Sequence, residues 1–194
     1  MDVQILKKPE GLSWEEIQKV LNQAHQSNRK KGIVMRKPSL TAEELFKEIG
    51  EEGVMLVAMD DSRVVGTAAL LVKECSKWYN EGQYGYLCFA SVLPEYLGKG
   101  VYRRLCEERE KIARDKGLKG LLFDTHHNNK RVISINCHNG FKRVGVRIFE
   151  SHWNIVLFKW LNGSEHSSFE CFFRYCISLV RMQLFRIKRA LVNG

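Results

Sequence analysis

Residues 92–104 read Val92-Leu93-Pro94-Glu95-Tyr96-Leu97-Gly98-Lys99-Gly100-Val101-Tyr102-Arg103-Arg104. An apolar run that begins at Tyr84 meets a proline here, passes through a turn with two glycines and enters a helix-like segment. Glycine permits positive φ and has no Cβ to block a ligand. Amides at a helix start lack intrahelical partners, and the helix dipole adds partial positive charge there. We therefore expect either an anion cradle suited to phosphate or pyrophosphate, or an ordinary strand-to-helix connection.

Size and composition indicate one globular domain, or one domain with an appendage. Of the 194 residues, 44% are hydrophobic, which is enough to bury a core without disulfides. The six cysteines form no C-x-x-C pair, and the N-terminus lacks the pattern of a signal peptide. We therefore expect free thiols and a cytoplasmic protein.

The net charge of +9 suggests a nucleic-acid or anionic partner. The basic excess is confined to residues 29–37 and to the tail after Arg174, and the remaining charges are mixed in sign. No zinc-finger, helix-turn-helix or RNA-binding signature accompanies it. We therefore expect no nucleic-acid partner.

Periodicity and turn signals predict the order of elements in the chain. Two capping boxes, at Ser13 with Glu16 and at Thr41 with Glu44, mark two helix starts. The second helix is short and contains Leu45, Phe46 and Ile49. The predicted strands cover residues 3–6, 54–59, 64–72, 84–92, 120–124, 144–150 and 153–160. The other predicted helices cover residues 14–27, 101–115 and 131–137, and residues 28–39 are predicted to be loop.

Residues 167–192 differ from the rest, because they predict one long amphipathic helix. Arg174, Arg181, Lys188 and Arg189 fall on one side, with Met182 and Phe185 toward that polar side as a hint of a second contact surface. Three uses stay open: packing on its own domain, pairing with a second subunit, or lying on an anionic membrane surface. The apolar stripe comprises Phe169, Phe172, Phe173, Cys176, Val180, Leu184, Ile187 and Leu191.

The element order and two motifs together resemble the GNAT N-acetyltransferase superfamily. Residues 92–101 look like its acetyl-CoA signature, and Asn129 is followed by Asn139-Gly140-Phe141-Lys142, which is similar to the segment that closes the GNAT fold. The resemblance extends over residues 1–161. It implies an α/β (α+β) fold, with a mixed, mostly antiparallel twisted sheet flanked by helices. The C-terminal amphipathic helix of residues 163–194 would be an addition to a domain of residues 1–162.

The resemblance also implies the cofactor and its site. Acetyl-CoA would be the co-substrate, and a primary amine of a small molecule would attack its thioester directly in a ternary complex. Val92 and Leu93 would lie along the pantetheine arm, and Asn129 near the cofactor. The pyrophosphate would be held by Gly98, Lys99, Gly100, Val101, Tyr102 and Arg103.

Two departures from the family pattern bear on activity. Glu95 occupies the position of a usual Gln or Arg, and a carboxylate near a diphosphate is repulsive. We therefore expect weaker cofactor affinity, with Glu95 turned outward or toward the helix amides. Asn136 matches the tyrosine that often protonates the thiolate, and Asn cannot act as an acid. The alternative hypothesis is therefore an acyl-CoA-binding domain with little turnover that acts as sensor or scaffold through its C-terminal helix.

The catalytic acid and base stay unassigned, with His126, His127 and Asn136 as the candidates. Either histidine could be a base or a surface residue, because an unperturbed imidazole titrates near neutrality. Cys137 and His138 with these histidines match no zinc spacing, so we expect no metal. Trp78 and Tyr79 either wall the acceptor pocket or pack a loop. Arg29, Lys30, Lys31, Arg36 and Lys37 are either a solvated face or a site for an anionic acceptor.

Overall fold

The computed structural model describes residues 2–30, 32–33, 40–74, 82–149, 151–161 and 168–193. Contacts divide the chain into two compact units, Met1–Leu121 and Leu122–Gly194, and each is described by itself. Trp78, Tyr79, Lys31, Arg36 and Lys37 lie outside the described residues. The domain boundary at residue 162 stays a prediction.

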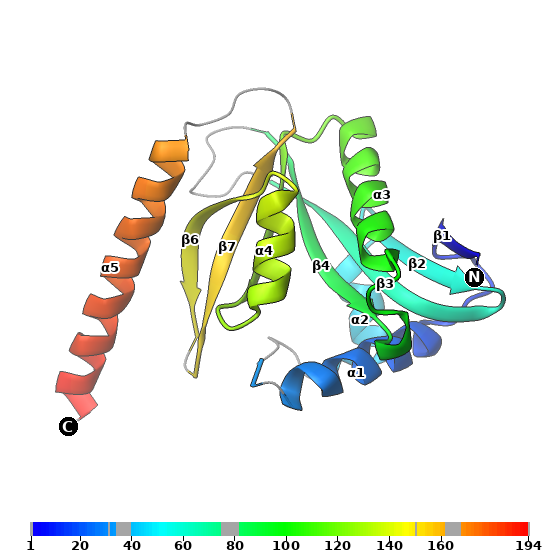
Figure 1. The fold of residues 1–194 in the computed structure, drawn as a ribbon, viewed down its shortest axis with the longest axis horizontal. Coiled ribbons are helices and arrows are strands. Elements are labelled where there is room, and N and C mark those ends of the chain that lie inside the picture. Colours follow the sequence, from blue (N-terminus) through cyan, green and yellow to red (C-terminus); the bar gives the residue numbers. More distant parts are fainter. Residues whose placement is uncertain are drawn as a thin grey trace. The chain divides into compact units, whose positions relative to one another are not determined.

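A seven-stranded sheet has the order β1-β2-β3-β4-β5-β7-β6. Figure 1 shows the helices and strands in the order of the chain. The pairs β1–β2, β2–β3, β3–β4 and β6–β7 are antiparallel. Helices flank the strands, and a further long helix ends the chain. The fold class expected from the sequence is confirmed.

The first unit is built on four consecutive antiparallel strands. They are β1 (Val3–Lys7), β2 (Val54–Asp60), β3 (Arg63–Lys73) and β4 (Tyr84–Val92). Residues 64–71 of β3 are all buried. Because successive side chains point to opposite faces of a strand, both faces of β3 must be covered.

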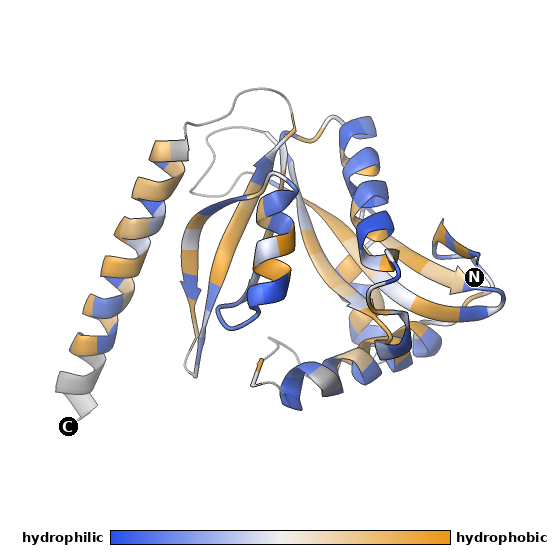
Figure 2. Cartoon of the chain, in the orientation of Figure 1, coloured by the Kyte–Doolittle hydropathy of each residue, from blue (hydrophilic) through white to orange (hydrophobic). Residues whose placement is uncertain are grey.

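Three helices supply that cover. They are α1 (Trp14–Lys30), α2 (Ala42–Ile49) and α3 (Val101–Asp115), and each contacts β3. Figure 2 shows apolar residues along β2 and β3 and mostly polar residues along α3. Leu105 of α3 and Ile17 of α1 are fully buried. The core of this unit therefore lies between the sheet and the apolar side of each helix.

Both predicted capping boxes are present. Thr41 Oγ1 accepts from Glu44 N at 3.1 Å and Glu44 Oε2 accepts from Thr41 N at 2.9 Å. The same two bonds join Ser13 and Glu16 at 3.3 Å each. The first helix ends three residues later than predicted, at Lys30. Basic side chains in a last turn interact favourably with the helix dipole, which accounts for the extension.

The second unit holds most of β5 (Gly120–His126) and the elements that follow it. These are α4 (Lys130–His138), β6 (Lys142–Ile148), β7 (Trp153–Trp160) and α5 (Ser168–Asn193). Strands β6 and β7 form an antiparallel hairpin with a register shift between Arg143 and Gly145. Helix α5 contacts β6.

The face that α5 packs differs from the apolar stripe expected from the sequence. Cys171, Ser178 and Met182 are buried, whereas Phe169, Phe173 and most other residues of the stripe are exposed. The hint of a second contact surface agrees with the structure for Met182, which is buried, but not for Phe185, which is exposed. Hydrophobic periodicity locates the apolar faces of a helix but does not say which one its own domain covers.

Candidate functional site

The turn between β4 and α3 has two glycines in the left-handed region. Gly98 has φ of 81° and Gly100 has φ of 80°, and Gly100 is the N-cap of α3. A Cβ built at either position would meet no described protein atom within 4 Å. Backbone conformation therefore requires glycine here, and the space next to both residues is open.

The start of α3 offers main-chain donors to an anion. Its first helical hydrogen bond runs from Arg104 N to Gly100 O at 3.1 Å. The helix itself therefore supplies no carbonyl to the amides of Val101, Tyr102 and Arg103. The first turns of α1 and α2 contain glutamates, but that of α3 has no acidic residue. No acidic side chain in the first turn of α3 therefore competes with a bound anion for the helix dipole.

The three basic side chains around the turn have different partners. Lys99 Nζ lies 5.0 Å from the ring centroid of Tyr96. Arg103 is exposed, with Nε 3.6 Å from Glu107 Oε1. Arg104 instead donates to the carbonyl of Val3.

The apolar residues among the predicted cofactor contacts are buried. Val92, Leu93 and Val101 each expose less than a tenth of their surface. The Leu93 amide donates to Val65 O at 2.9 Å, which ties the chain after β4 to β3. These side chains therefore belong to the core, and the main chain of Leu93 is bonded on both sides, because its carbonyl also accepts from Tyr96 N at 2.9 Å.

The β2–β3 hairpin holds the turn by two side-chain pairs. Tyr96 belongs to the short helix η1 (Pro94–Tyr96), and its hydroxyl donates to Asp60 Oδ2 at 2.7 Å. This bond, which favours the neutral phenol, raises the pKa of Tyr96. Arg63 Nη2 donates to Glu95 Oε1 at 2.7 Å. The turn conformation is thus set by residues more than thirty positions upstream.

The negative charge of Glu95 is balanced by the guanidinium of Arg63. Its pKa is lowered, first by a hydrogen bond from its own backbone amide and then by Arg63. The carboxylate is therefore ionised but carries its own counterion. This pairing reduces the repulsion toward a diphosphate that the sequence predicts for this position.

Strand β4 contains a bulge four residues before the turn. Cys88 pairs with Ala69 and Ser91 pairs with Thr67, so that Phe89 and Ala90 together face one residue of β3. Phe89 has φ of 51°, and Thr67 Oγ1 donates to its carbonyl at 2.8 Å. The extra residue interrupts the simple alternation of side chains that the sequence predicts for this strand. It also removes main-chain groups of β4 from the ladder with β3.

The second unit contains the remaining predicted site residues. Asn129 is the N-cap of α4, and its Nδ2 donates to Thr125 Oγ1 at 3.1 Å. Asn136 is buried within α4, and its Nδ2 donates to Val132 O at 2.8 Å. Asn136 therefore has a structural bond inside its own helix, and an amide at this position supplies no acid.

The two candidate histidines differ in the nitrogen that carries the proton. His126 Nδ1 accepts from the amide of Asn128 at 3.2 Å, so that its neutral ring has the proton on Nε2. His127 Nδ1 lies 3.1 Å from Trp153 O, and a carbonyl can only accept. The neutral ring of His127 therefore keeps a lone pair on Nε2, whereas neutral His126 has none to offer.

These histidines belong to a stack of rings. The ring centroids of His126 and His127 are 4.4 Å apart, and those of His126 and His152 are 5.3 Å apart. Trp153 stacks on His127 with centroids 4.4 Å apart. The pKa of His126 is lowered by burial and then by the charges of His127 and His152. Burial and His127 also lower the pKa of His152, although Asp124 acts in the opposite direction.

Asp124 organises the strands beside this stack. Its side chain is only 3% exposed and accepts from Arg147 Nη1 and from Asn154 Nδ2, at 2.6 Å each. The network joins β5, β6 and β7. Charge-assisted bonds of this length hold the ends of the three strands in register.

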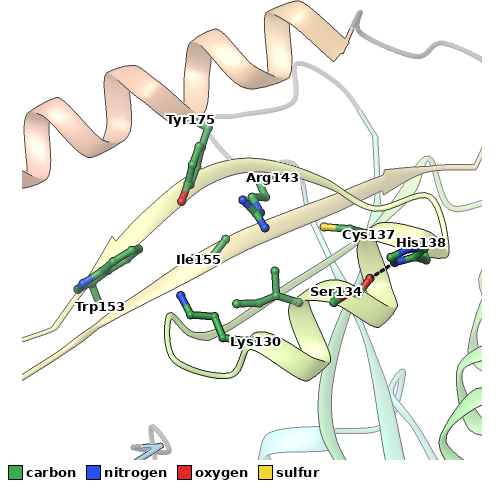
Figure 3. Close-up of a pocket in the computed structure, with 9 residues that line it drawn as sticks. Lys130, Ser134, Cys137, His138, Arg143, Trp153, Ile155 and Tyr175 are labelled. Carbon is green, nitrogen blue, oxygen red and sulfur yellow. Dashed lines mark hydrogen bonds between the residues drawn. The ribbon is translucent and has the colours of Figure 1, made fainter.

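A pocket of about 420 Å³ also lies in the second unit. Figure 3 shows Lys130 and Arg143 directed into it, with Trp153 and Tyr175 at its side. His138 Nδ1 is hydrogen-bonded to Ser134 O at 2.8 Å. His126, His127 and Asn136 do not line this pocket. Among the described residues no cluster of potential ligands could hold a metal ion.

The comparison of sequences with family models gives one family. A model described as the acetyltransferase (GNAT) family matches residues 14–141, which is more than half of the chain. The match contains the glycine turn, His126, His127, Asn129 and Phe141. The comparison with curated proteins found no match.

Solved acetyltransferase structures share the fold. PaiA N-acetyltransferase from Thermoplasma acidophilum in complex with coenzyme A is 23% identical, with a TM-score of 0.64 over 83% of this chain and 100% of that chain. The ribosomal-protein-S18-alanine N-acetyltransferase from Escherichia coli is 14% identical, with a TM-score of 0.62 over 86% of this chain and 99% of that chain. A GNAT acetyltransferase from Streptococcus pneumoniae is 14% identical, with a TM-score of 0.62 over 83% of this chain and 100% of that chain.

The lowered pKa values of His126 and His152 predict that the protein loses stability in mild acid. The unfolded chain binds protons at these histidines as pH falls below about 6.5, before the folded chain does. The free energy of unfolding should therefore fall with pH in this range, as measured by urea denaturation. In the double variant His126→Asn/His152→Asn the slope should be shallower. An unchanged slope would show that other groups cause the acid sensitivity.

Proposed function

Because the chain belongs to the acetyltransferase (GNAT) family, we propose that it is an acetyl-CoA-dependent N-acetyltransferase that acts on a primary amine of a small molecule. One observation carries the proposal: the turn before α3 combines two positive-φ glycines, open space and a helix start without acidic residues. These features suit a pyrophosphate.

The residues of the turn fit the cofactor in the proposed roles. Gly98, Lys99, Gly100, Val101, Tyr102 and Arg103 would surround the pyrophosphate, which main-chain amides of the turn and of the start of α3 would hold. The amide of Lys99 already donates to Tyr96 O at 3.4 Å, so Lys99 would contribute mainly its charge. Lys99 and Arg103 also contribute exposed positive charge. Val92 and Leu93 would lie along the pantetheine arm, with both side chains directed into the core. Asn129 is also proposed to lie near the cofactor.

Acetyl-CoA, when bound, supplies a thioester carbonyl whose carbon forms a bond to the amine nitrogen as its bond to sulfur breaks. The chain would contribute main-chain N–H groups of the bulged part of β4, around Phe89 and Ala90, to the oxygen of that carbonyl. Holding amine and thioester together would supply much of the rate. The amine must first lose its ammonium proton.

We assign the removal of that proton to His127, directly or through water. The support is the state of its ring: Nδ1–H is fixed on Trp153 O, which leaves Nε2 as an acceptor. His126 is the less suitable candidate, because its Nδ1 is already occupied by the amide of Asn128. Asn136 has no role in proton transfer in this proposal, and solvent would protonate the thiolate.

A domain that binds acyl-CoA with little turnover is the second candidate. The observation in its favour is Asn136, whose amide is buried and bonded to Val132 O at a position where a tyrosine would supply an acid. Such a domain would act as a sensor or scaffold through α5. It would bind the cofactor and release no thiol.

Cofactor binding is tested at Gly100. In isothermal calorimetry the wild type should bind acetyl-CoA, and Gly100→Trp should abolish binding, because the indole would fill the open space. Gly100→Ala should weaken binding. Gly117→Ala is the matched control, since Gly117 also has positive φ and open space but lies at the far end of α3. Both alanine variants should lose similar stability, about 1–2 kcal/mol. Absence of binding in the wild type would refute the proposal.

The pair of Arg63 and Glu95 predicts a double-mutant cycle. Arg63→Gln should weaken acetyl-CoA binding about two- to fivefold, because Glu95 then faces the pyrophosphate without its counterion. Glu95→Gln should not weaken binding. The double variant should return to the wild-type dissociation constant within about twofold. Equal losses in the two single variants would mean that the pair acts on the fold of the turn, not on its charge.

Turnover is tested by thiol release with a panel of small amines and an alanine-started peptide. His127→Asn preserves the bond to Trp153 O but removes Nε2, so kcat should fall about tenfold to a hundredfold near neutral pH and recover as pH rises. His126→Asn, which preserves the acceptor for Asn128 N, should change kcat less than about threefold. Release with the peptide alone would contradict the small-molecule acceptor. Cofactor binding without release for any amine would favour the scaffold.

A further inference from the structure

Helix α5 has a second apolar face that its own unit leaves uncovered. Successive residues of a helix are about 100° apart around its axis, and at this spacing one stripe about 60° wide contains Phe169, Phe173, Val180, Leu184 and Ile187. The buried residues Cys171, Ser178 and Met182 centre about 170° away, on the side of β6. The two apolar faces are therefore on opposite sides of one helix. Figure 2 shows apolar residues along the whole described length of α5.

The uncovered face is extensive. Phe169 is 76% exposed, Leu184 is 60% exposed and Phe173 is 57% exposed. Phe172 and Ile177 extend the stripe on its two sides and are also exposed. Monomeric proteins rarely expose so many large apolar side chains together, and such a patch marks a surface that meets a partner.

The edges of this face are basic. Arg174, Arg181 and Lys188 recur every seven residues and lie along one edge, and Arg186 lies beyond Phe172 on the other. The sole acidic residue in the sequence of α5 is Glu170, whose Oε1 already accepts from Arg174 Nη2 at 2.9 Å. The face thus combines an apolar centre rich in phenylalanine with cationic borders.

We propose that this face of α5 lies on an anionic lipid surface, with its phenylalanines among the acyl chains and its basic edges at the headgroups. Charge decides between a membrane and a second copy of the chain. A symmetric helix pair would bring cationic edges together without acidic partners, whereas anionic lipid attracts each of them.

The geometry agrees with a helix in the plane of the surface. With 26 residues, α5 is about 39 Å long. No helix among the described residues is long and apolar enough to cross a membrane. The side of α5 that faces β6 stays packed on protein, so only the opposite side enters the lipid. This inference is independent of the proposed acetyl transfer.

Vesicle flotation of the full chain tests the proposal. Wild type should float with vesicles of phosphatidylcholine and phosphatidylglycerol, and at least about tenfold less with phosphatidylcholine alone or at high salt. The variant Phe173→Glu/Leu184→Glu should lower partitioning at least about tenfold. Arg181→Gln/Lys188→Gln should lower it about tenfold on anionic vesicles only.

Phe46→Glu on α2 is the matched control, because Phe46 is as exposed as Phe173, at 57%. It should float like the wild type, and circular dichroism should show all variants folded. Failure of the wild type to float with anionic vesicles would overturn the proposal, as would an equal loss in Phe46→Glu. If light scattering shows a dimer that Phe173→Glu/Leu184→Glu dissociates, without vesicle binding, the face belongs to a second copy and the proposal is wrong.

Discussion

The hydrogen bond between the Tyr96 hydroxyl and the Asp60 carboxylate holds the turn before α3, on which the proposed chemistry depends. The bond from Tyr96 to Asp60, beside the pair of Arg63 and Glu95, fixes the turn before α3 to the β2–β3 hairpin. Because η1 is anchored, the chain that leads into the two glycines of positive φ is fixed in place. The amides that start α3 are then presented by a rigid frame. Preorganised donors of this kind bind an anion without a cost for ordering the loop.

Local signals in the sequence predict much of this architecture, because capping, periodicity and glycine turns depend on neighbouring residues. Helix 101–115, strand 84–92 and both capping boxes were predictable for that reason. The partner of Glu95 was not, since Arg63 lies thirty-two residues earlier and no spacing rule connects them. The bulge at Phe89 was missed for a similar reason: it depends on the register with β3. The tautomers of His126 and His127 depend on bonds that only the fold creates.

Helix α5 shows where periodicity reaches its limit. The sequence contains two apolar faces, one rich in phenylalanine and one with Cys171 and Met182, and hydrophobicity favours the first as the core. The folded unit uses the second, where smaller residues allow close approach to β6. The larger apolar face of α5 is exposed and the smaller one is buried. Packing within its own unit therefore does not explain why the phenylalanine-rich face is apolar.

The contact between α5 and β6 has a consequence for the sheet. Strand β6 is last in the strand order, so no other strand of the described residues pairs with its outer edge. An uncovered edge is a template for pairing with other chains and for aggregation. Figure 1 shows α5 running beside β6. The helix thus also shields the margin of the sheet, and a chain cut before residue 168 would expose that margin to association between molecules.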